Sequence, residues 1–165
     1  VESFDFMREI KWGSINGDPL PHKGYPWRVT REMVAEGQSL MCPNWMEEGP
    51  FANNSVKYLV ENIGIEFDKF LEPLGYVREG NFYRVTRENS ETVAMVSHGG
   101  SSSAAISHLF NLPFPFFCNT VHMDFTSIIV VKFPEDEGKL VAPRFELLAD
   151  SRHIGNIDGE VVFGT

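Results

Sequence analysis

The sequence has little of what would place the chain in a membrane, on nucleic acid or in an oxidising compartment. No apolar run approaches the ~20 residues that a membrane-spanning helix needs. The 14 Lys and Arg residues are outnumbered by 23 Asp and Glu residues, and the net charge of −9 argues against nucleic-acid and anionic-lipid partners. The two cysteines, Cys42 and Cys118, form no Cys-x-x-Cys pair, which favours reduced thiols and a cytoplasmic location.

The chain also lacks a signal peptide, internal repeats and low-complexity tracts. It starts at Val1 with an acidic stretch, which is unlike a leader and resembles sequence from inside a longer protein. Its 165 residues fit one domain of the usual ~100–200 residues. With 42% hydrophobic residues and 14 Phe, the chain can fill a core. We therefore expect residues 1–165 to form a single domain.

The most informative stretch joins an apolar run to a helix through a glycine turn. After Glu91, residues 92–96 are mostly apolar and rich in β-branched side chains, which predicts a buried strand. The polar turn 97–100 contains two glycines, so the backbone can turn sharply and a ligand can approach closely. Residues 102–110 predict a helix that opens with serines. Free backbone N–H groups and the helix dipole predict an anion site there, with His98 at its mouth.

A lone histidine at a strand end is often a capping or core residue, but the sequence around His98 favours a functional role. Val96-Ser97-His98-Gly99-Gly100, followed by a serine-rich helix, resembles the second-histidine motif of the histidine phosphatase superfamily. The resemblance implies an α/β fold of the phosphoglycerate mutase type, a three-layer α/β/α sandwich. It also implies phosphoryl transfer through a phosphohistidine, without a metal or cofactor.

A second segment resembles the acid segment of the same superfamily. Glu9 precedes Gly13 by four positions, and Gly17 follows. In relatives that carry the acid here, it protonates the leaving oxygen of the phosphate ester, and burial is the usual way to hold such a proton near neutral pH. The resemblance implies that Glu9 acts as acid and then base, while His98 and the Gly99 N–H stabilise the phosphoryl oxygens.

The superfamily's nucleophile has no counterpart in these residues. In relatives, the phosphorylated histidine lies in an Arg-His-Gly motif on the first strand. Arg152-His153 is followed by Ile154 and comes after the last predicted strand, so we reject it as the nucleophile. The resemblance covers the C-terminal two-thirds of the family's domain. We therefore expect an incomplete domain without its N-terminal strand and helix, completed by a missing N-terminal segment of the same protein.

The remaining patterns predict a mixed α/β framework. An amphipathic helix over 54–72, capped by Asn53 or Asn54, is the clearest element. Arg78, Arg84 and Arg87 are interpreted as solvated surface charges. The other predicted elements are a helix over 30–37, a hairpin about Gly80-Asn81, a rigid aromatic loop over 112–117, and strands over 123–133 and 145–150; the main sheet should include 92–96 and 123–133.

Two other classes of protein compete with a phosphatase. The Ser-His-Gly-Gly turn is also similar to the oxyanion-hole stretch of esterases with the α/β-hydrolase fold, but the sequence has no Gly-x-Ser-x-Gly elbow. The other alternative is a non-catalytic phosphate-binding relative or structural fragment. The histidines show no metal-site spacing. We expect a small phosphorylated substrate. The sequence leaves open which substrate this is, whether the activity is that of a phosphatase or a mutase, and whether the protein is a monomer or a homodimer.

Overall fold

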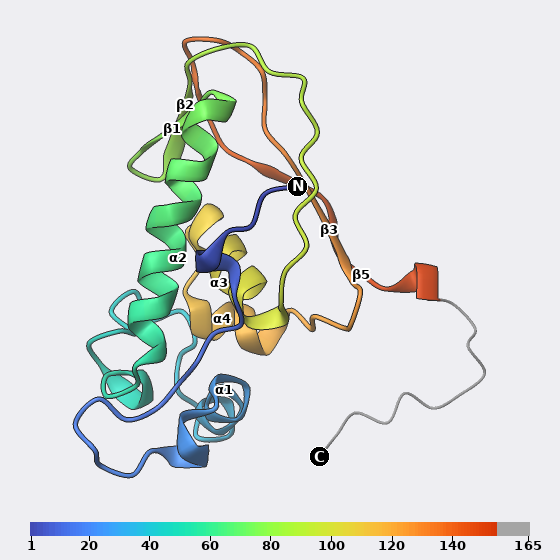
Figure 1. The fold of residues 1–165 in the computed structure, drawn as a ribbon. Helices are drawn as coiled ribbons and strands as arrows, with labels where there is room; N and C mark the ends of the chain where they lie inside the picture. The colour runs from blue at the N-terminus through green and yellow to red at the C-terminus, as the bar shows by residue number, and fades with distance from the viewer. Residues whose placement is uncertain (155–165) are drawn as a thin grey trace.

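Four helices form the body of the molecule, and two small antiparallel sheets extend from it (Figure 1). The computed structural model describes residues 1–154. The α-helices are α1 (Pro26–Ala35), α2 (Val56–Leu71), α3 (Gly99–Leu109) and α4 (Phe114–Thr120). Short 3-10 turns lie at Asp5–Met7, Pro21–Gly24, Gly49–Phe51, Glu72–Leu74 and Arg152–Ile154.

The predicted amphipathic helix is confirmed as α2. Its buried positions recur at intervals of three and four residues and include Val56, Val60 and Ile63. The N-cap residue is Ser55 and not the predicted Asn53 or Asn54, although the side-chain oxygen of Asn54 accepts the Val56 N–H at 3.1 Å. The helix ends in a 3-10 turn, after which Gly75 takes the left-handed conformation, with φ of 94°.

The predicted hairpin is also confirmed. β1 (Tyr76–Glu79) pairs antiparallel with β2 (Phe82–Val85), and Gly80-Asn81 make the two-residue turn. β2 also pairs with the short β4 (Leu140–Val141), which gives a three-stranded sheet. Within residues 1–154, β3 (Ile128–Lys132) pairs with β5 (Arg144–Asp150) alone, as a separate two-stranded sheet.

Three sequence expectations need correction. Residues 92–96 do not form a strand: within the described chain, residues 92–97 make no backbone–backbone hydrogen bond, and a strand exists only with a partner. The strand expected over 123–133 is shorter and consists of β3 alone. The sheet that contains β3 does not include residues 92–96. The loop expected over 112–117 is instead the start of α4, because Pro115 occupies the first turn of a helix, where its missing N–H does no harm.

The three-layer sandwich is therefore not confirmed, although the α/β class is. The described residues hold helices and two small antiparallel sheets rather than one sheet between two helical layers. The predicted helices over 30–37 and 102–110 are present as α1 and α3, which begin four and three residues earlier than expected. None of the helices within residues 1–154 is long and apolar enough to cross a membrane.

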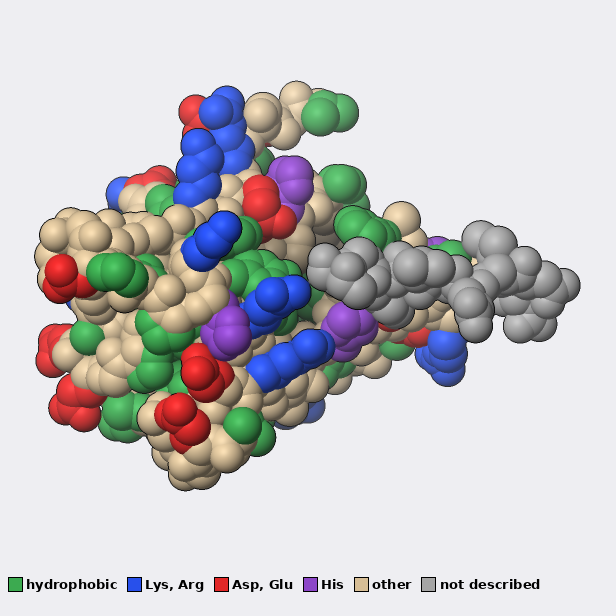
Figure 2. Space-filling model, turned by 90° about the horizontal axis from the view of Figure 1, so that it is seen from below, with side chains coloured by type: hydrophobic (Ala, Val, Ile, Leu, Met, Phe, Trp, Pro, Cys, Tyr) green, Lys and Arg blue, Asp and Glu red, His purple; other side chains and the backbone are tan. Residues whose placement is uncertain are grey.

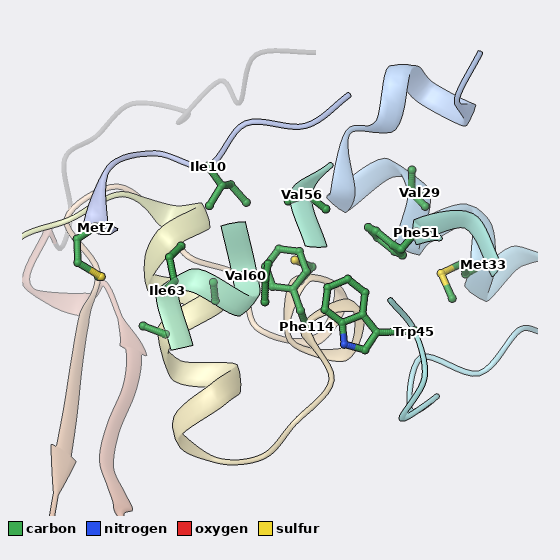
Figure 3. Close-up of a cluster of buried hydrophobic side chains, with 13 residues drawn as sticks. Met7, Ile10, Val29, Met33, Trp45, Phe51, Val56, Val60, Ile63 and Phe114 are labelled. Carbon is green, nitrogen blue, oxygen red and sulfur yellow. The ribbon is translucent and has the colours of Figure 1, made fainter. Parts of the chain in front are cut away.

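Two hydrophobic clusters fill the interior. In the first, Phe114 of α4 lies among side chains of α2, and Trp45 and Phe51 link it to α1 (Figure 3). Met7 and Ile10 of the N-terminal segment close its other side. The second cluster joins α3 to the three-stranded sheet through Ile106, Leu109 and Tyr83. The N-terminal segment is thus packed into the core next to the start of α3.

Candidate functional site

The turn before α3 is tied to the N-terminal segment by two serines. The hydroxyls of Ser97 and Ser101 both donate to the carbonyl oxygen of Met7, at 2.8 and 2.9 Å, and lie 2.8 Å from each other. Ser101 is fully buried and the Met7 side chain belongs to the core. These bonds hold residues 7–9 beside the beginning of α3, although about ninety residues separate them in sequence.

Glu9 lies at the N-terminus of α3. Its Oε1 accepts hydrogen bonds from the Gly100 N–H at 3.1 Å and from the Ile10 N–H at 2.9 Å. A carboxylate at a helix N-terminus satisfies free donors and interacts favourably with the dipole. Glycine is needed at position 100, because a Cβ there would collide with both Glu9 and Ile10. Glu9 Oε2 has no hydrogen-bond partner in the described residues.

His98 is the N-cap residue of α3, with extended backbone angles of φ −106° and ψ 162°. Its carbonyl oxygen accepts the Ser102 N–H at 3.0 Å, while its exposed side chain has no hydrogen-bond partner within residues 1–154. The Gly99 N–H is likewise unpaired in that range. Glu9, His98 and Gly99 therefore meet at one helix end, with an uncommitted imidazole and an uncommitted N–H beside a carboxylate.

A group of polar side chains that the sequence analysis did not single out follows α4. His122 Nε2 lies 3.0 Å from Asp124 Oδ1, and Asp124 Oδ2 accepts the Ser151 hydroxyl at 3.2 Å. The neighbouring Met123 is close to the site: its Cβ lies 3.9 Å from where a Cβ on Gly99 would be. No spacing in the sequence marks this group, since its members come from a loop and from the end of β5.

The rejected pair Arg152-His153 is exposed and used locally. Arg152 donates from Nε and from a terminal nitrogen to Asp150, at 2.6–3.1 Å, and these hydrogen bonds lower the pKa of Asp150 to about 2. The His153 ring lies 3.3 Å from the Thr126 hydroxyl. Neither residue approaches the start of α3 through any described contact. In the described part of the chain, no group of three or more His, Cys, Asp or Glu side chains could hold a metal ion.

The opposite end of α3 carries a polar network that sequence reasoning missed. Asp68 accepts from His108 Nε2 through one oxygen and from the Tyr83 hydroxyl through the other, both at 2.8 Å. Arg78 donates to the Tyr83 hydroxyl at 2.7 Å and to the His108 carbonyl at 3.3 Å, and it also bonds Asn111. Arg78, interpreted from sequence as a solvated charge, is thus largely enclosed, with an 18% exposed side chain.

The network changes the ionisation of its members. Burial of Asp68 opposes its charge, but hydrogen bonds from His108 and Tyr83, and the charges of His108 and Arg78, prevail and lower its pKa. Burial and the neighbouring carboxylate raise the pKa of Tyr83 well above its usual range. One signal in the sequence could have indicated the network, because Gly64 lies inside α2, where glycine is unfavourable. In the structure a Cβ at this position would lie 2.5 Å from His108 Nδ1, so glycine leaves space for the ring.

Comparison with known proteins agrees with the resemblance drawn from the glycine turn. The family model of the histidine phosphatase superfamily (branch 1) matches residues 79–145, which contain His98, α3, α4 and β3. The match covers less than half of the chain and begins in the hairpin, so it leaves out Glu9. No curated protein and no solved structure matches the chain. Residues 79–145 are therefore similar to part of a domain of the histidine phosphatase superfamily.

Proposed function

We propose that the intact protein is a phosphomonoesterase that works through a phosphohistidine, with His98, Gly99 and Glu9 as this chain's contribution. One observation carries the proposal. The acidic side chain implied by the resemblance reaches the histidine turn, with Glu9 Oε1 3.1 Å from the Gly100 nitrogen. The segment with Glu9 precedes α2 in the sequence and the histidine turn follows it. The match to the superfamily covers only the histidine turn.

In this reaction each residue has a separate task. His98 and the Gly99 N–H hold the equatorial oxygens of the phosphoryl group, whose charge increases as the bond to the leaving oxygen breaks. Glu9 gives its proton to that leaving oxygen, and the phosphoryl group passes to the nucleophilic histidine. Glu9 then takes a proton from water as the water oxygen attacks the phosphohistidine, which regenerates the acid and releases phosphate.

The geometry of Glu9 suits this exchange of a proton. Oε1 is fixed by the N–H groups of Ile10 and Gly100, whereas Oε2 has no partner in the described residues. One oxygen therefore sets the direction of the carboxyl group, and the other is available to hold the proton. The serine bonds to Met7 keep the carboxyl group beside the helix end.

The nucleophile belongs, in this proposal, to a further N-terminal segment of the same protein that pairs along residues 92–97. Those residues make no backbone–backbone hydrogen bond within the described chain, and Val93 and Val96 are 49% and 97% exposed. Peptide groups without partners on both sides favour pairing with another strand. Such pairing would also provide the sheet of a three-layer sandwich around residues 92–96.

Titration of the chain with inorganic phosphate, followed by backbone and histidine NMR signals, tests the site. We expect the largest shifts at the Gly99 amide and the His98 ring, and we expect His98→Ala to remove them. His153→Ala is the matched control, because this exposed histidine lies outside the site. Shifts that persist unchanged in His98→Ala would contradict the assignment of the site.

The position of the nucleophile has a test of its own. Incubated with a phosphomonoester such as p-nitrophenyl phosphate, the 165-residue chain should release no product above the level of His98→Ala. Turnover by this chain alone, lost in a variant of one of its other histidines, would show that the nucleophile is among these residues and that the proposed additional segment is wrong.

A further inference from the structure

An exposed row of aromatic rings lies close in sequence to Glu9. The ring centroids of Trp12 and Tyr25 are 5.1 Å apart, and those of Tyr25 and Trp27 are 5.2 Å apart. Trp12 and Tyr25 are 37% and 36% exposed, and Trp27 is half-buried. Trp27 packs against the first hydrophobic cluster, so the row runs from the core out to two exposed rings, Tyr25 and Trp12, and large aromatic side chains usually bury their rings.

Hydrogen bonds to the residues before α2 hold this row in place. The carbonyl oxygen of Gly13, next to Trp12, accepts the Ser55 N–H at 2.8 Å. The carbonyl oxygen of Gly24, next to Tyr25, accepts from the side-chain amide of Asn54 at 2.8 Å. Asn54 is completely buried, and a Cβ at Gly24 would lie only 3.0 Å from its nitrogen. The two chain segments that carry the rings are thus fixed to the same short stretch.

Four cations close to the row in sequence have no acidic ion-pair partner among residues 1–154. Lys11, Lys23, Arg28 and Arg31 are exposed, and none of them forms an ion pair within the described residues. Elsewhere in the chain, arginines such as Arg78, Arg84 and Arg87 are paired with carboxylates. Seen from the end of the molecule where α1 lies, Lys, Arg and His side chains lie around a hydrophobic patch, with some Asp and Glu side chains beside them (Figure 2). In a chain of net charge −9, this face favours an anion.

The row is connected directly to the proposed phosphate site. Trp12 follows Glu9 by three residues, a stretch of chain that spans at most about 11 Å. Ile10, which lies between them, is 3% exposed. Its side chain lies against Gly100, in the space that a Cβ on that residue would occupy. The backbone is therefore anchored at Glu9 and Ile10 on one side and at Gly13 on the other, with Lys11 and Trp12 exposed between the anchors.

We propose that this aromatic and cationic face binds the alcohol part of the substrate, and that the substrate is a phosphate monoester carrying a planar ring, of the nucleoside monophosphate type. The inference rests on the proposed function for the position of the phosphate. The ring of the ligand stacks on Trp12 and Tyr25, which recognise a flat π-face of any base, and the positive charges of Lys11 and Arg28 attract the anionic phosphate ester to this face.

A matched pair of probes tests the role of the ring. Adenosine monophosphate and ribose 5-phosphate share the sugar phosphate and differ in the base. We expect the full chain to bind adenosine monophosphate at least about tenfold more tightly in calorimetric titration, because base–aromatic stacking is a strong contribution for single nucleotides. Equal affinities for the two probes would overturn the inference.

Substitutions locate the binding surface. Trp12→Ala and Tyr25→Ala should each weaken adenosine monophosphate binding about tenfold and leave ribose 5-phosphate binding unchanged, while Trp12→Phe retains most of the affinity. Phe125→Ala is the control, since Phe125 is 85% exposed but is not part of the row. Circular dichroism confirms that each variant is folded. An effect of Phe125→Ala as large as that of Trp12→Ala would contradict the assignment.

His98→Ala separates this inference from the proposed function. If the preference for adenosine monophosphate over ribose 5-phosphate depends on Trp12 but neither probe responds to His98→Ala, the ring site stands and the phosphate site is wrong. If inorganic phosphate binding depends on His98 but the two probes bind equally, the phosphate site stands and the ring site is wrong.

Discussion

The two ends of α3 each carry a histidine, and the protein uses them in opposite ways. At the C-terminal end, His108 is held by Asp68, while Arg78 bonds its carbonyl oxygen. At the N-terminal end, the exposed side chain of His98 has no hydrogen-bond partner among the described residues. At the same helix end the Glu9 carboxylate binds backbone N–H groups instead.

Glycine makes room at both ends, but for different neighbours. Gly64 lets the His108 ring lie against the backbone of α2, and Gly100 lets Glu9 and Ile10 approach the first turn of α3. At the first end both carboxylate oxygens of Asp68 accept hydrogen bonds, whereas at the second end one carboxylate oxygen and one imidazole have no partner among residues 1–154. A satisfied network stabilises the fold, and an unsatisfied exposed cluster is available for a ligand.

The largest effect on stability should follow from removing the centre of the satisfied network. Breaking a buried ion pair costs about 3–5 kcal/mol, and because Asp68 keeps 20% exposure we expect Asp68→Ala to cost about 2–3 kcal/mol. The midpoint of thermal unfolding should fall by about 5–10 °C. Glu66→Ala is the control on the same helix: its ion pair with Lys69 is exposed, so the change should stay within about 0.5 kcal/mol. Equal losses in the two variants would show that the network is not what stabilises this end.

The second largest effect should come from filling the space at Gly64. A Cβ there meets His108 Nδ1 at 2.5 Å, so Gly64→Ala must displace the ring and should cost about 1–2 kcal/mol in urea unfolding, even though alanine favours the helix.

Combination with His108→Ala tests this reason. In that background the ring is absent, and the same change should stabilise the protein by up to ~1 kcal/mol. If Gly64→Ala is destabilising in both backgrounds, contact with His108 is not the cause.

Acid should reduce the difference between Asp68 and its neutral isostere. The folded-state pKa of Asp68 is lowered, so its charge contributes stability fully above the unfolded pKa of about 3.9, and the contribution is lost as the pH falls through the folded pKa. The free energies of unfolding of the wild type and Asp68→Asn should therefore differ at pH 7 and converge below about pH 4. A difference that is constant over this range would argue that hydrogen-bond geometry, and not charge, sets the effect of the substitution.

The elements that sequence could predict are those with local signals. α2 is marked by its apolar period and by Asn54, and the β1–β2 hairpin by Gly80-Asn81. The prediction of a strand over 92–96 was wrong. The composition of this segment is typical of a strand, but a strand forms only when it pairs with another, and the described chain supplies no partner.

The candidate site shows the same division. His98 and Glu9 were found through motifs, and the structure brings them to one helix end. The network of Asp68, Tyr83, Arg78 and His108 joins four elements over up to forty positions, and no local pattern marks such a contact. Only Gly64, unfavourable inside a helix, gave a sign that something packs closely there.

The smallest effect on stability is expected at the free end, where ligand binding should change instead. Glu9→Gln keeps an oxygen for the Ile10 and Gly100 N–H groups, so stability should change by less than about 0.5 kcal/mol. In the proposed cycle Glu9 alternates between a protonated acid and an ionised base, and the ionised form repels a phosphate held by the Gly99 N–H and His98, whereas the amide of Glu9→Gln carries no charge. Inorganic phosphate should therefore bind Glu9→Gln several-fold more tightly than the wild type, measured by titration of the Gly99 amide signal. Asp68→Asn, at the satisfied end, should leave phosphate affinity unchanged while lowering stability. Weaker phosphate binding in Glu9→Gln would mean that Glu9 does not face the anion, and the contrast between the two ends of α3 would then have no functional meaning.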